Sequence, residues 1–363
     1  MKILSLSREE HDWKLIPGYA DALRRKGIEV IFADTAIPFD VSLKELLRRY
    51  PADISAILHF ESAHPLFPIG LEQSPVPTVC FHPDTYAFTS RRIVWSSVFD
   101  HVAVFHPGYV EQFAAAGHPG AFLLPHAVER RLYEGSEIAR EFELGWVGQT
   151  GGQVYKTREQ WLPKLAQQFR MNDWSRTYTI PEVAQIYRRS RIVVNIGRDD
   201  FPQDANLRVF EVLASGALLI TKLPSELTSL GFDDGAHFVG YREESEIAGL
   251  VRRYLNDDVQ RAKIGNAARE VMLLKHTYDE RVDEIIGRLA KYSSQKLAPA
   301  RSWPAPRARL SALDFFSAQN LVACSARQFR QIAGRGFHET VHGASLFARS
   351  WLKGLRLVRA VRK

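Results

Sequence analysis

The sequence predicts an α/β protein built from two parallel-sheet domains and a basic C-terminal segment. Its 363 residues are 45% hydrophobic and 25% charged, as in a globular chain of about two domains. Short apolar runs alternate with amphipathic stretches in two successive series, and each apolar run is continuous. Continuous apolar strands separated by helices are typical of a parallel sheet that helices cover on both faces.

The first series predicts a Rossmann-like domain over residues 1–128. Helices are expected at 15–26, ending at Gly27, near 43–50 and after the fifth strand. The strands are expected at 2–7, 29–33, 54–60, 77–81, 101–105 and 121–124.

A polar segment, 129–141, precedes the second series, which predicts another Rossmann-like domain over residues 142–293. Two such domains face each other across a cleft, and open α/β sheets bind ligands outside the carboxyl ends of their strands. We therefore expect a ligand site there. The strands are expected at 142–147, 191–196, 217–221 and 237–241, and the helices at 160–169, 207–215, 243–256 and about 259–292.

Residues 294–363 predict a basic linker and a helical tail. Residues 296–363 hold 13 basic and two acidic side chains, a net charge of +11, which leaves −4 for residues 1–295. On a helix from Ala344, Phe347, Trp351 and Leu355 share one face and basic residues occupy the other. This pattern favours an anionic membrane surface, with docking on the chain's own body, on a partner or on RNA as alternatives. The mildly acidic body disfavours nucleic acid.

Several classes of protein are excluded or disfavoured. Two cysteines cannot make a disulfide framework, and no apolar run approaches the roughly 18 residues of a membrane span. The N-terminus lacks the apolar core of a signal peptide, so we expect a cytoplasmic protein, peripheral at the inner face of the membrane if the tail binds lipid. His338-Glu339-Thr340-Val341-His342 matches a zinc-protease pattern, but no third ligand follows it, so we expect no metal site.

The segment 191–221 is the richest in polar residues that suit a ligand. A strand leads through a polar loop into a helix that opens near Asn206, carries Arg208 and Glu211, and closes at Gly216. A helix N-terminus presents N–H groups and a positive dipole end to a phosphate, and a carboxylate one turn later can accept hydrogen bonds from a ribose diol. Alternatively, Arg208 and Glu211 form a surface ion pair.

Asn206-Leu207-Arg208-x-Phe210-Glu211-x-x-Ala214-x-Gly216 resembles the core motif of the group 1 glycosyltransferases, most closely their spore-maturation-type branch. The resemblance covers about 142–289 and ends at His276-Thr277-Tyr278-x-x-Arg281. It implies the two-domain type B fold and transfer of a hexose from a nucleotide-sugar co-substrate to a glycan, lipid-linked or protein acceptor. It also implies retention of anomeric configuration. We expect no cofactor and no metal, because a positive cluster can replace one.

The resemblance assigns roles to individual residues. Glu211 would bind the ribose, and the backbone amides of Asn206 and Leu207 would cradle the diphosphate. Related enzymes carry a second glutamate where Gln203 stands, and Gln203 can bind a sugar hydroxyl but carries no negative charge. Either an aspartate among Asp199, Asp200 and Asp204 compensates, or the site is catalytically degenerate.

Two further loops resemble the same family. Gly148 opens a glycine-containing loop that would meet the donor phosphates, with Lys156 or Arg158 neutralising them. This loop is neither a Walker A nor a dinucleotide motif, and its alternative interpretation is a simple turn.

In the first domain, His82 and Asp84 follow a strand and would project into the cleft to touch the acceptor or donor sugar, where either could assist proton removal. Alternatively, Asp84 caps the next helix. His59, Glu61 and His64 end the preceding strand and are weaker candidates.

Two other functions fit the same residues. A sugar-nucleotide epimerase shares the two-domain layout but would turn over a nucleotide sugar without an acceptor. A degenerate transferase would bind the nucleotide sugar without transferring it.

Overall fold

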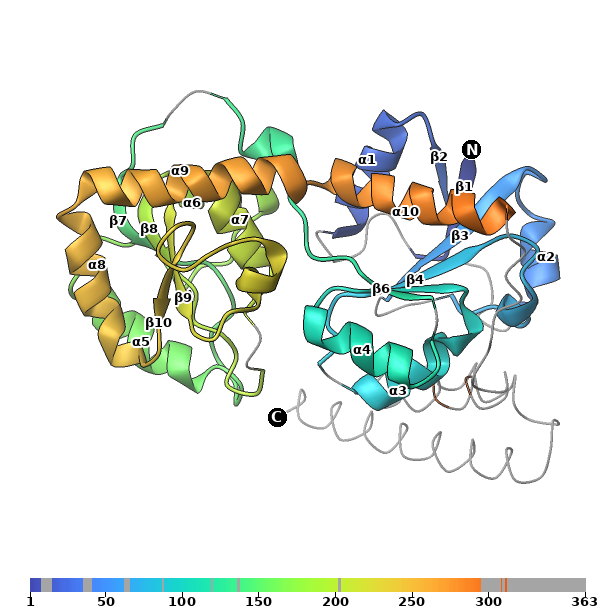
Figure 1. Ribbon diagram of the computed structural model, residues 1–363, viewed down its shortest axis with the longest axis horizontal. Helices are drawn as coiled ribbons and strands as arrows, with labels where there is room; N and C mark the ends of the chain where they lie inside the picture. Colours follow the sequence, from blue (N-terminus) through green and yellow to red (C-terminus); the bar gives the residue numbers. More distant parts are fainter. Residues whose placement is uncertain are drawn as a thin grey trace, which may run out of the picture. The chain divides into compact units, whose positions relative to one another are not determined.

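The structure is a computed structural model that describes residues 1–7, 15–34, 41–61, 66–86, 88–118, 120–135, 138–201, 204–294, 308 and 311. It divides into two compact units. Unit 1 combines Met1–Leu124 with the chain from Val282 onwards, and unit 2 is Pro125–Arg281 (Figure 1). Each unit contains one parallel sheet, which confirms the predicted α/β class.

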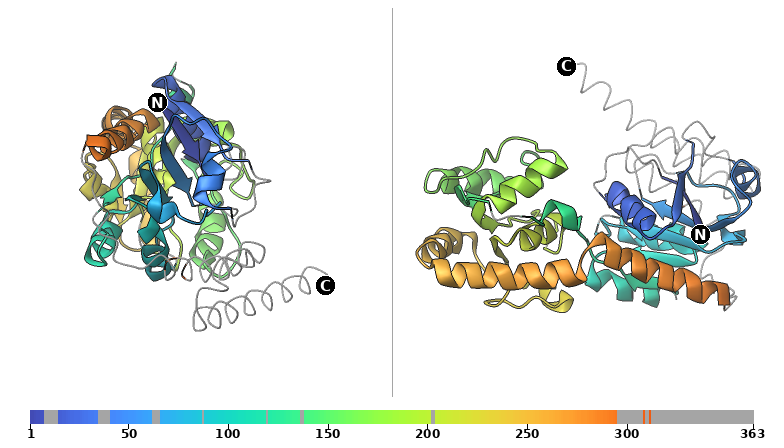
Figure 2. Two further views of the ribbon diagram at one scale, coloured as in Figure 1. Left: turned by 90° about the vertical axis from the view of Figure 1, so that its right-hand side faces the viewer. Right: turned by 90° about the horizontal axis from the view of Figure 1, so that it is seen from above.

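Unit 1 is a six-stranded parallel sheet in the order β2-β1-β3-β4-β5-β6. Helices lie on both faces of this sheet (Figure 2), which explains why β3 and β4 are buried along almost their whole length. The strands are β1 (Lys2–Ser5), β2 (Glu29–Phe32), β3 (Ile54–Phe60), β4 (Thr78–His82), β5 (His101–Val104) and β6 (Ala121–Leu123). The helices are α1 (Leu15–Arg25), α2 (Leu43–Leu47), α3 (Thr89–Trp95), α4 (Pro107–Ala115) and α10 (Tyr278–Ser294).

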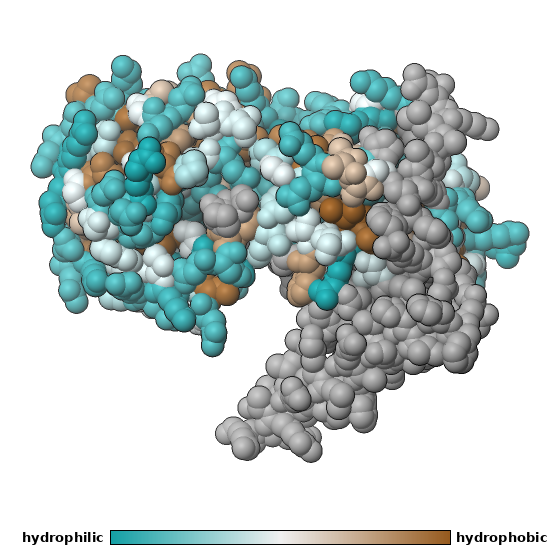
Figure 3. All heavy atoms as spheres, turned by 60° about the horizontal axis from the view of Figure 1, so that its bottom comes forward, coloured by the Kyte–Doolittle hydropathy of each residue, from teal (hydrophilic) through white to brown (hydrophobic). Residues whose placement is uncertain are grey.

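Unit 2 is a four-stranded parallel sheet in the order β10-β9-β8-β7. Its face in Figure 3 is covered mostly by hydrophilic side chains, because the apolar residues of its strands and helices lie in the core. The strands are β7 (Phe142–Gly145), β8 (Ser190–Val194), β9 (Leu218–Lys222) and β10 (Val239–Tyr241). The helices are α5 (Lys156–Ala166), α6 (Ile180–Arg188), α7 (Leu207–Ser215), α8 (Ile247–Leu255) and α9 (Asp258–Lys275).

The helix α6 was absent from the sequence prediction, although a start signal precedes it. Thr179 and Glu182 form a capping box, in which the Thr179 N–H donates to Glu182 Oε2 at 2.8 Å. A threonine followed three residues later by a glutamate is the sequence signature of such a box. The signal could therefore have located this helix.

The last predicted helix of the second domain, about 259–292, is two helices that belong to different units. The helix α9 ends at Lys275, and the chain from Val282 packs with unit 1. Val282, Ile285 and Leu289 of α10 are buried, and Asp283 pairs with Lys26 of unit 1 at 2.6 Å. The boundary at 293 is therefore corrected to Arg281, because the apolar face of α10 is buried in unit 1.

The motif His276–Arg281 has a structural role at this crossing. The Arg281 guanidinium donates to Pro125 O at 2.9 Å and to His276 Nδ1 at 2.6 Å. His276 Nε2 lies 3.2 Å from Leu230 O, and burial and the charge of Arg281 lower the pKa of His276 to about 3. Pro125 and Arg281 begin and end unit 2. Arg281 therefore ties together the two points where the chain changes units.

Only Ala308 and Ser311 are described beyond residue 294. Ala308, which the sequence places in a linker, is fully buried in the unit 1 core that includes Trp95, and Ser311 Oγ donates to Arg91 O at 2.8 Å. The predicted amphipathic helix and the histidine motif at 338–342 lie outside the described residues. Among the helices that are described, none is long and apolar enough to cross a membrane.

Candidate functional site

The candidate site of unit 2 lies where β7 and β8 end and α7 begins. Arg208, in the first turn of α7, donates from Nε to Val147 O at 2.5 Å and from Nη1 to Asn195 Oδ1 at 3.0 Å. Its guanidinium lies over the buried Trp146 ring, 5.3 Å from the centroid. Because the carboxyl ends of parallel strands meet at one edge, residues 146, 195 and 208 come together although they are far apart in the chain.

Gly148 is needed because Arg208 occupies the space a side chain would take. A Cβ at residue 148 would lie 2.2 Å from Arg208 Nη2 and 3.1 Å from Trp146 Cη2. The structure therefore brings together two predicted donor-binding residues, Gly148 and Arg208. Trp146, on which Arg208 stacks, was not among the residues singled out from the sequence.

Arg158 belongs to the same cationic cluster. Its side chain is only 4% exposed, its Nε donates to Ile196 O at 2.9 Å, and its guanidinium lies 4.4 Å from the Tyr155 ring centroid. Burial, followed by the nearby charge of Arg208, lowers the pKa of Arg158 to about 9. The like charge of Arg208 thus adds to the effect of burial. Lys156, the other phosphate candidate, is exposed at the start of α5, where its backbone N–H donates to Asp199 Oδ2 at 2.7 Å.

The N-terminus of α7 differs in one detail from the predicted phosphate cradle. Asn206 is the N-cap, but its side chain makes no capping hydrogen bond to the helix. Its backbone N–H donates to Asp204 O at 2.7 Å, so this amide is already used within the loop. We therefore remove the Asn206 amide from the predicted cradle. The backbone amide of Leu207, at the first position of α7, keeps its predicted role untested.

Glu211 is inside the unit, with a side chain only 6% exposed. Burial, followed by the charge of Glu211, raises the pKa of both Tyr133 and Tyr187. The alternative of a surface ion pair with Arg208 is therefore wrong. The guanidinium of Arg208 is directed to Val147 and Asn195, and Glu211 is a buried carboxylate. Its role in binding ribose stays a prediction.

The three aspartates that were considered as substitutes for a missing glutamate are engaged within the protein. Asp199 accepts the Lys156 amide, and Asp200 accepts from Arg198 at 2.8 and 2.9 Å. Asp204 is buried and accepts from Thr221 Oγ1 at 2.9 Å, from Ser225 Oγ at 2.7 Å and from the Glu226 amide at 2.9 Å. Each carboxylate thus has a local structural task. Gln203 lies outside the described residues.

Asp204 also belongs to a polar network that the sequence did not reveal. Thr221, which donates to Asp204, accepts from Asn195 Nδ2 at 3.1 Å, and Asn195 Oδ1 accepts from Arg208. This network joins the ends of β8 and β9 to the first turn of α7. It fixes the direction of the Arg208 side chain. Single polar residues at the ends of apolar strands, such as Asn195 and Thr221, were the available signal.

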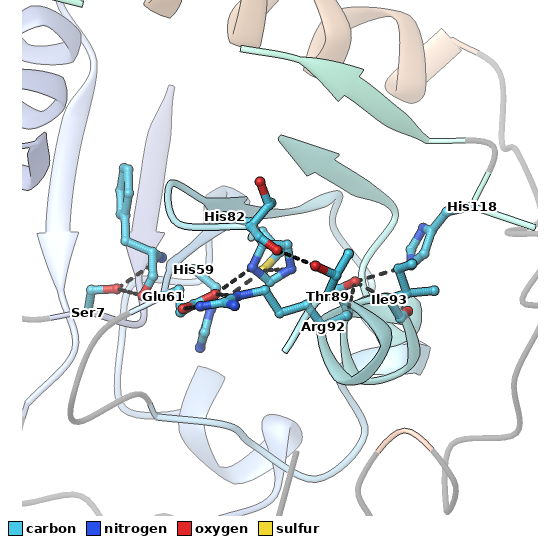
Figure 4. Close-up of polar contacts among 12 residues, drawn as sticks. Ser7, His59, Glu61, His82, Thr89, Arg92, Ile93 and His118 are labelled. Carbon is cyan, nitrogen blue, oxygen red and sulfur yellow. Dashed lines mark hydrogen bonds and ion pairs between the residues drawn. The ribbon is translucent and has the colours of Figure 1, made fainter. Parts of the chain in front are cut away.

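In unit 1, His82 ends β4 and is fully buried (Figure 4). Its Nδ1 lies 2.7 Å from Glu61 Oε2, and Arg92 Nε donates to the same oxygen at 2.7 Å while Nη2 bonds the other oxygen. Although burial favours its neutral form, Arg92 and His82 lower the pKa of Glu61 to about 2. Burial lowers the pKa of His82. The expectation that His82 projects to touch a substrate is wrong, because this ion pair holds its ring in the core.

The neighbouring candidates of unit 1 are also placed. Asp84 is half-buried beyond β4, and the N-cap of α3 is Phe88, so Asp84 does not cap that helix. His59 is buried, and desolvation followed by the charge of His82 lowers its pKa to about 3. His64 lies outside the described residues. Of the unit 1 candidates, Asp84 is therefore the one whose predicted contact with a sugar stays a prediction.

Comparison with protein families finds one match. Residues 143–287 match a family described as glycosyl transferase-like. This segment contains α7, Trp146 and all the described donor-site candidates. No curated protein matches the chain. This match does not confirm the resemblance to the spore-maturation-type branch.

Comparison with solved structures identifies the same fold over most of the chain. HepE of Anabaena, solved with UDP and glucose, is 14% identical, with a TM-score of 0.57 over 80% of this chain and 100% of that one. Sucrose-phosphate synthase of Thermosynechococcus elongatus is 12% identical, with a TM-score of 0.57 over 81% and 100%. A glycosyltransferase of Rickettsia africae is 9% identical, with a TM-score of 0.54 over 81% and 99%. The chain therefore has the type B glycosyltransferase fold, and its residues 143–287 are similar to glycosyl transferase-like proteins.

Proposed function

We propose that the chain is a hexosyltransferase that moves a sugar from a nucleotide-sugar donor to an acceptor. The observation that carries this proposal is the cationic cluster of Arg208 and Arg158 beside Trp146, at the first turn of α7. The cluster lies inside the segment that matches glycosyl transferase-like proteins. HepE, which shares the fold, was solved with UDP-glucose, so UDP is the first ligand to test.

The chemistry needs positive charge where the leaving group gains negative charge. When the glycosidic C–O bond of the donor breaks, the nucleoside diphosphate takes the electron pair. The guanidinium of Arg208 and the N–H groups at the start of α7 would stabilise that charge in place, without reorganisation. Arg158, whose guanidinium lies 5.7 Å from the Trp146 ring centroid, would add to the field. Because three sources of positive charge meet here, we propose a reaction that needs no metal ion.

Glu211 would hold the nucleoside by accepting hydrogen bonds from the two ribose hydroxyls. It lies on α7, as Arg208 does, so one helix would bind both ribose and diphosphate. The resemblance to the spore-maturation-type branch supports a retaining reaction. Asp84 would lie on the acceptor side, with a glycan, a lipid-linked glycan or a protein as acceptor. The C-terminal tail would bind an anionic membrane surface.

The test is calorimetry with UDP, GDP and ADP on the whole protein. Wild type is expected to bind at least one of them, and Glu211→Ala to bind it roughly tenfold or more weakly, because a charged hydrogen-bond acceptor is lost. Glu270→Ala is the matched control, since Glu270 is an exposed carboxylate on α9 of the same unit. Equal binding by Glu211→Ala and wild type would refute the site.

A degenerate binding module is the second candidate. It is favoured by the engagement of Asp199, Asp200 and Asp204 in local contacts. Product analysis separates the candidates. A transferase consumes UDP-sugar in proportion to a glycosylated acceptor, a binding module consumes none, and an epimerase converts the donor without any acceptor.

A further inference from the structure

A second pocket of unit 2 lies at the opposite end of α7 from the candidate donor site. It has a volume of about 320 Å³, and its lining includes Tyr133, Arg140, Arg188, Ser215, Asn266 and Arg269. Ser215 is the last residue of α7, and Arg208 is in its first turn. At 1.5 Å per residue, the two ends of this helix are roughly 12 Å apart. The pocket is therefore separate from the site proposed for the donor.

The lining of this pocket is strongly basic. It includes three arginines, and no acidic side chain is among the lining residues in the described part of the chain. The three arginines outweigh the C-terminal end of the α7 dipole, which amounts to roughly half a negative charge. The lining residues thus carry a net positive charge, and the buried carboxylate of Glu211 acts on the lining residue Tyr133.

Two of the arginines are fixed in place by backbone carbonyl groups. Arg140 donates to Ser190 O at 2.5 Å and to Gly216 O at 2.9 Å, and Arg269 Nη2 donates to Tyr133 O at 2.8 Å. A Cβ at Gly216 would lie 3.3 Å from both Arg140 Nη2 and Arg269 Cδ, so the two side chains converge on this residue. Carbonyl groups orient a guanidinium without neutralising its charge, and each guanidinium has five N–H donors.

We propose that this pocket binds a small phosphate-bearing anion. The planar fork of arginine matches phosphate oxygens in pairs, and half-buried guanidiniums bind phosphate more strongly than fully hydrated ones. At about 30 Å³ for each water, the pocket has the volume of roughly ten waters, enough for a diphosphate group. The proposal does not depend on transferase activity.

The test is titration of the full chain with pyrophosphate, followed by calorimetry, with UDP present at saturation to occupy the donor site. Arg188→Gln is expected to weaken pyrophosphate binding roughly tenfold, by loss of one charged fork. Arg170→Gln is the matched control, because Arg170 is exposed in the same unit and does not line the pocket. It should leave the affinity unchanged. Sulfate at the same ionic strength controls for screening.

Further variants keep the result interpretable. Arg208→Gln in the candidate donor site should leave pyrophosphate binding intact. Loss of pyrophosphate binding in Arg208→Gln together with normal binding by Arg188→Gln would overturn the proposal. If Arg188→Gln does not fold, Asn266→Trp tests the pocket by filling its mouth, since Asn266 is exposed and lines it. Glu137 is next to the lining residue Ile138 in the sequence. Binding that appears only in Glu137→Gln would show a pocket already neutralised by the chain, and would also overturn the proposal.

Discussion

Gly148→Ala tests the donor site with the smallest possible change. The new Cβ would lie 2.2 Å from Arg208 Nη2 and 3.0 Å from Arg208 Cζ. Ordinary contact begins at about 3.4 Å, so the guanidinium must move by about 1 Å or more. Such a shift breaks the hydrogen bonds of Arg208 to Val147 O and Asn195 Oδ1, which measure 2.5 and 3.0 Å.

The cost in stability is expected to be moderate. A hydrogen bond to a charged group is worth about 1.5–3 kcal/mol, and Arg208 is half-exposed, so the end of its side chain can find water instead. We therefore expect a loss of about 1–2 kcal/mol in the free energy of unfolding, measured by urea denaturation. UDP affinity should fall as far as in Arg208→Ala, because both changes remove the guanidinium from the same place.

Gly197→Ala is the matched control at the same edge of the sheet. Among the residues that the structure describes, a Cβ there would meet only Phe201 O, at 3.9 Å. This variant should keep both stability and UDP affinity. Gly148→Ala combined with Arg208→Ala should be no weaker than either single variant, since the two act through one side chain. Additive losses, or normal UDP binding by Gly148→Ala, would refute the reasoning.

Other variants and conditions test the remaining interactions. Deleting 296–363 should lower the melting temperature more than deleting 313–363, because the longer deletion removes a residue buried in the unit 1 core; equal effects in scanning calorimetry would contradict this. Arg281→Leu should cost about 2–4 kcal/mol in urea denaturation, since buried carbonyls lose their donor; a change below 1 kcal/mol would show that another group replaces it. The pKa values of His59 and His276 are lowered from 6.5 to about 3, so their contribution is full above pH 6.5 and is lost as pH falls toward 3. At pH 5 the stability lost is up to about 2 kcal/mol for each histidine. The free energy of unfolding should therefore depend less steeply on pH in His276→Asn. EDTA should leave transferase activity unchanged, as judged by release of the nucleoside diphosphate.

Local patterns predicted most of the secondary structure. Continuous apolar runs located the strands of both sheets, and α7 occupies the predicted 207–215. The helix α10 shows where this reasoning stops. Its apolar spacing indicates a buried face, but nothing in that spacing tells which sheet will cover it. Only the packed structure shows that Val282 and its neighbours belong to unit 1.

The candidate site was predicted in part for a similar reason. The resemblance to the glycosyltransferase motif singled out Gly148, Arg208 and Glu211, and their positions on a loop and a helix followed from the sequence. Burial was not predictable from spacing. His82 was expected to project into the cleft, but it is held in the core by Glu61, which also pairs with Arg92. Whether such a side chain is buried depends on its partners from other elements, and these partners lie far away in the chain.

The way charges are paired in unit 2 is the strongest physical reason to expect an anion beside α7. Arg158 and Arg208 bond to carbonyl oxygens, to the Asn195 amide and to aromatic faces, none of which carries a negative charge. Three nearby carboxylates bond other groups. Asp199, whose charge partly offsets the repulsion on Arg158, accepts from the Lys156 amide, Asp200 pairs with Arg198, and Asp204 accepts hydroxyl and amide donors. Burial contributes most to the lowered pKa of Arg158, and repulsion from Arg208 adds to it. An anion beside Arg208 would relieve that repulsion, so its binding should raise the pKa of Arg158. The affinity for the anion should fall as salt is added. Salt-independent binding of UDP would contradict this electrostatic account.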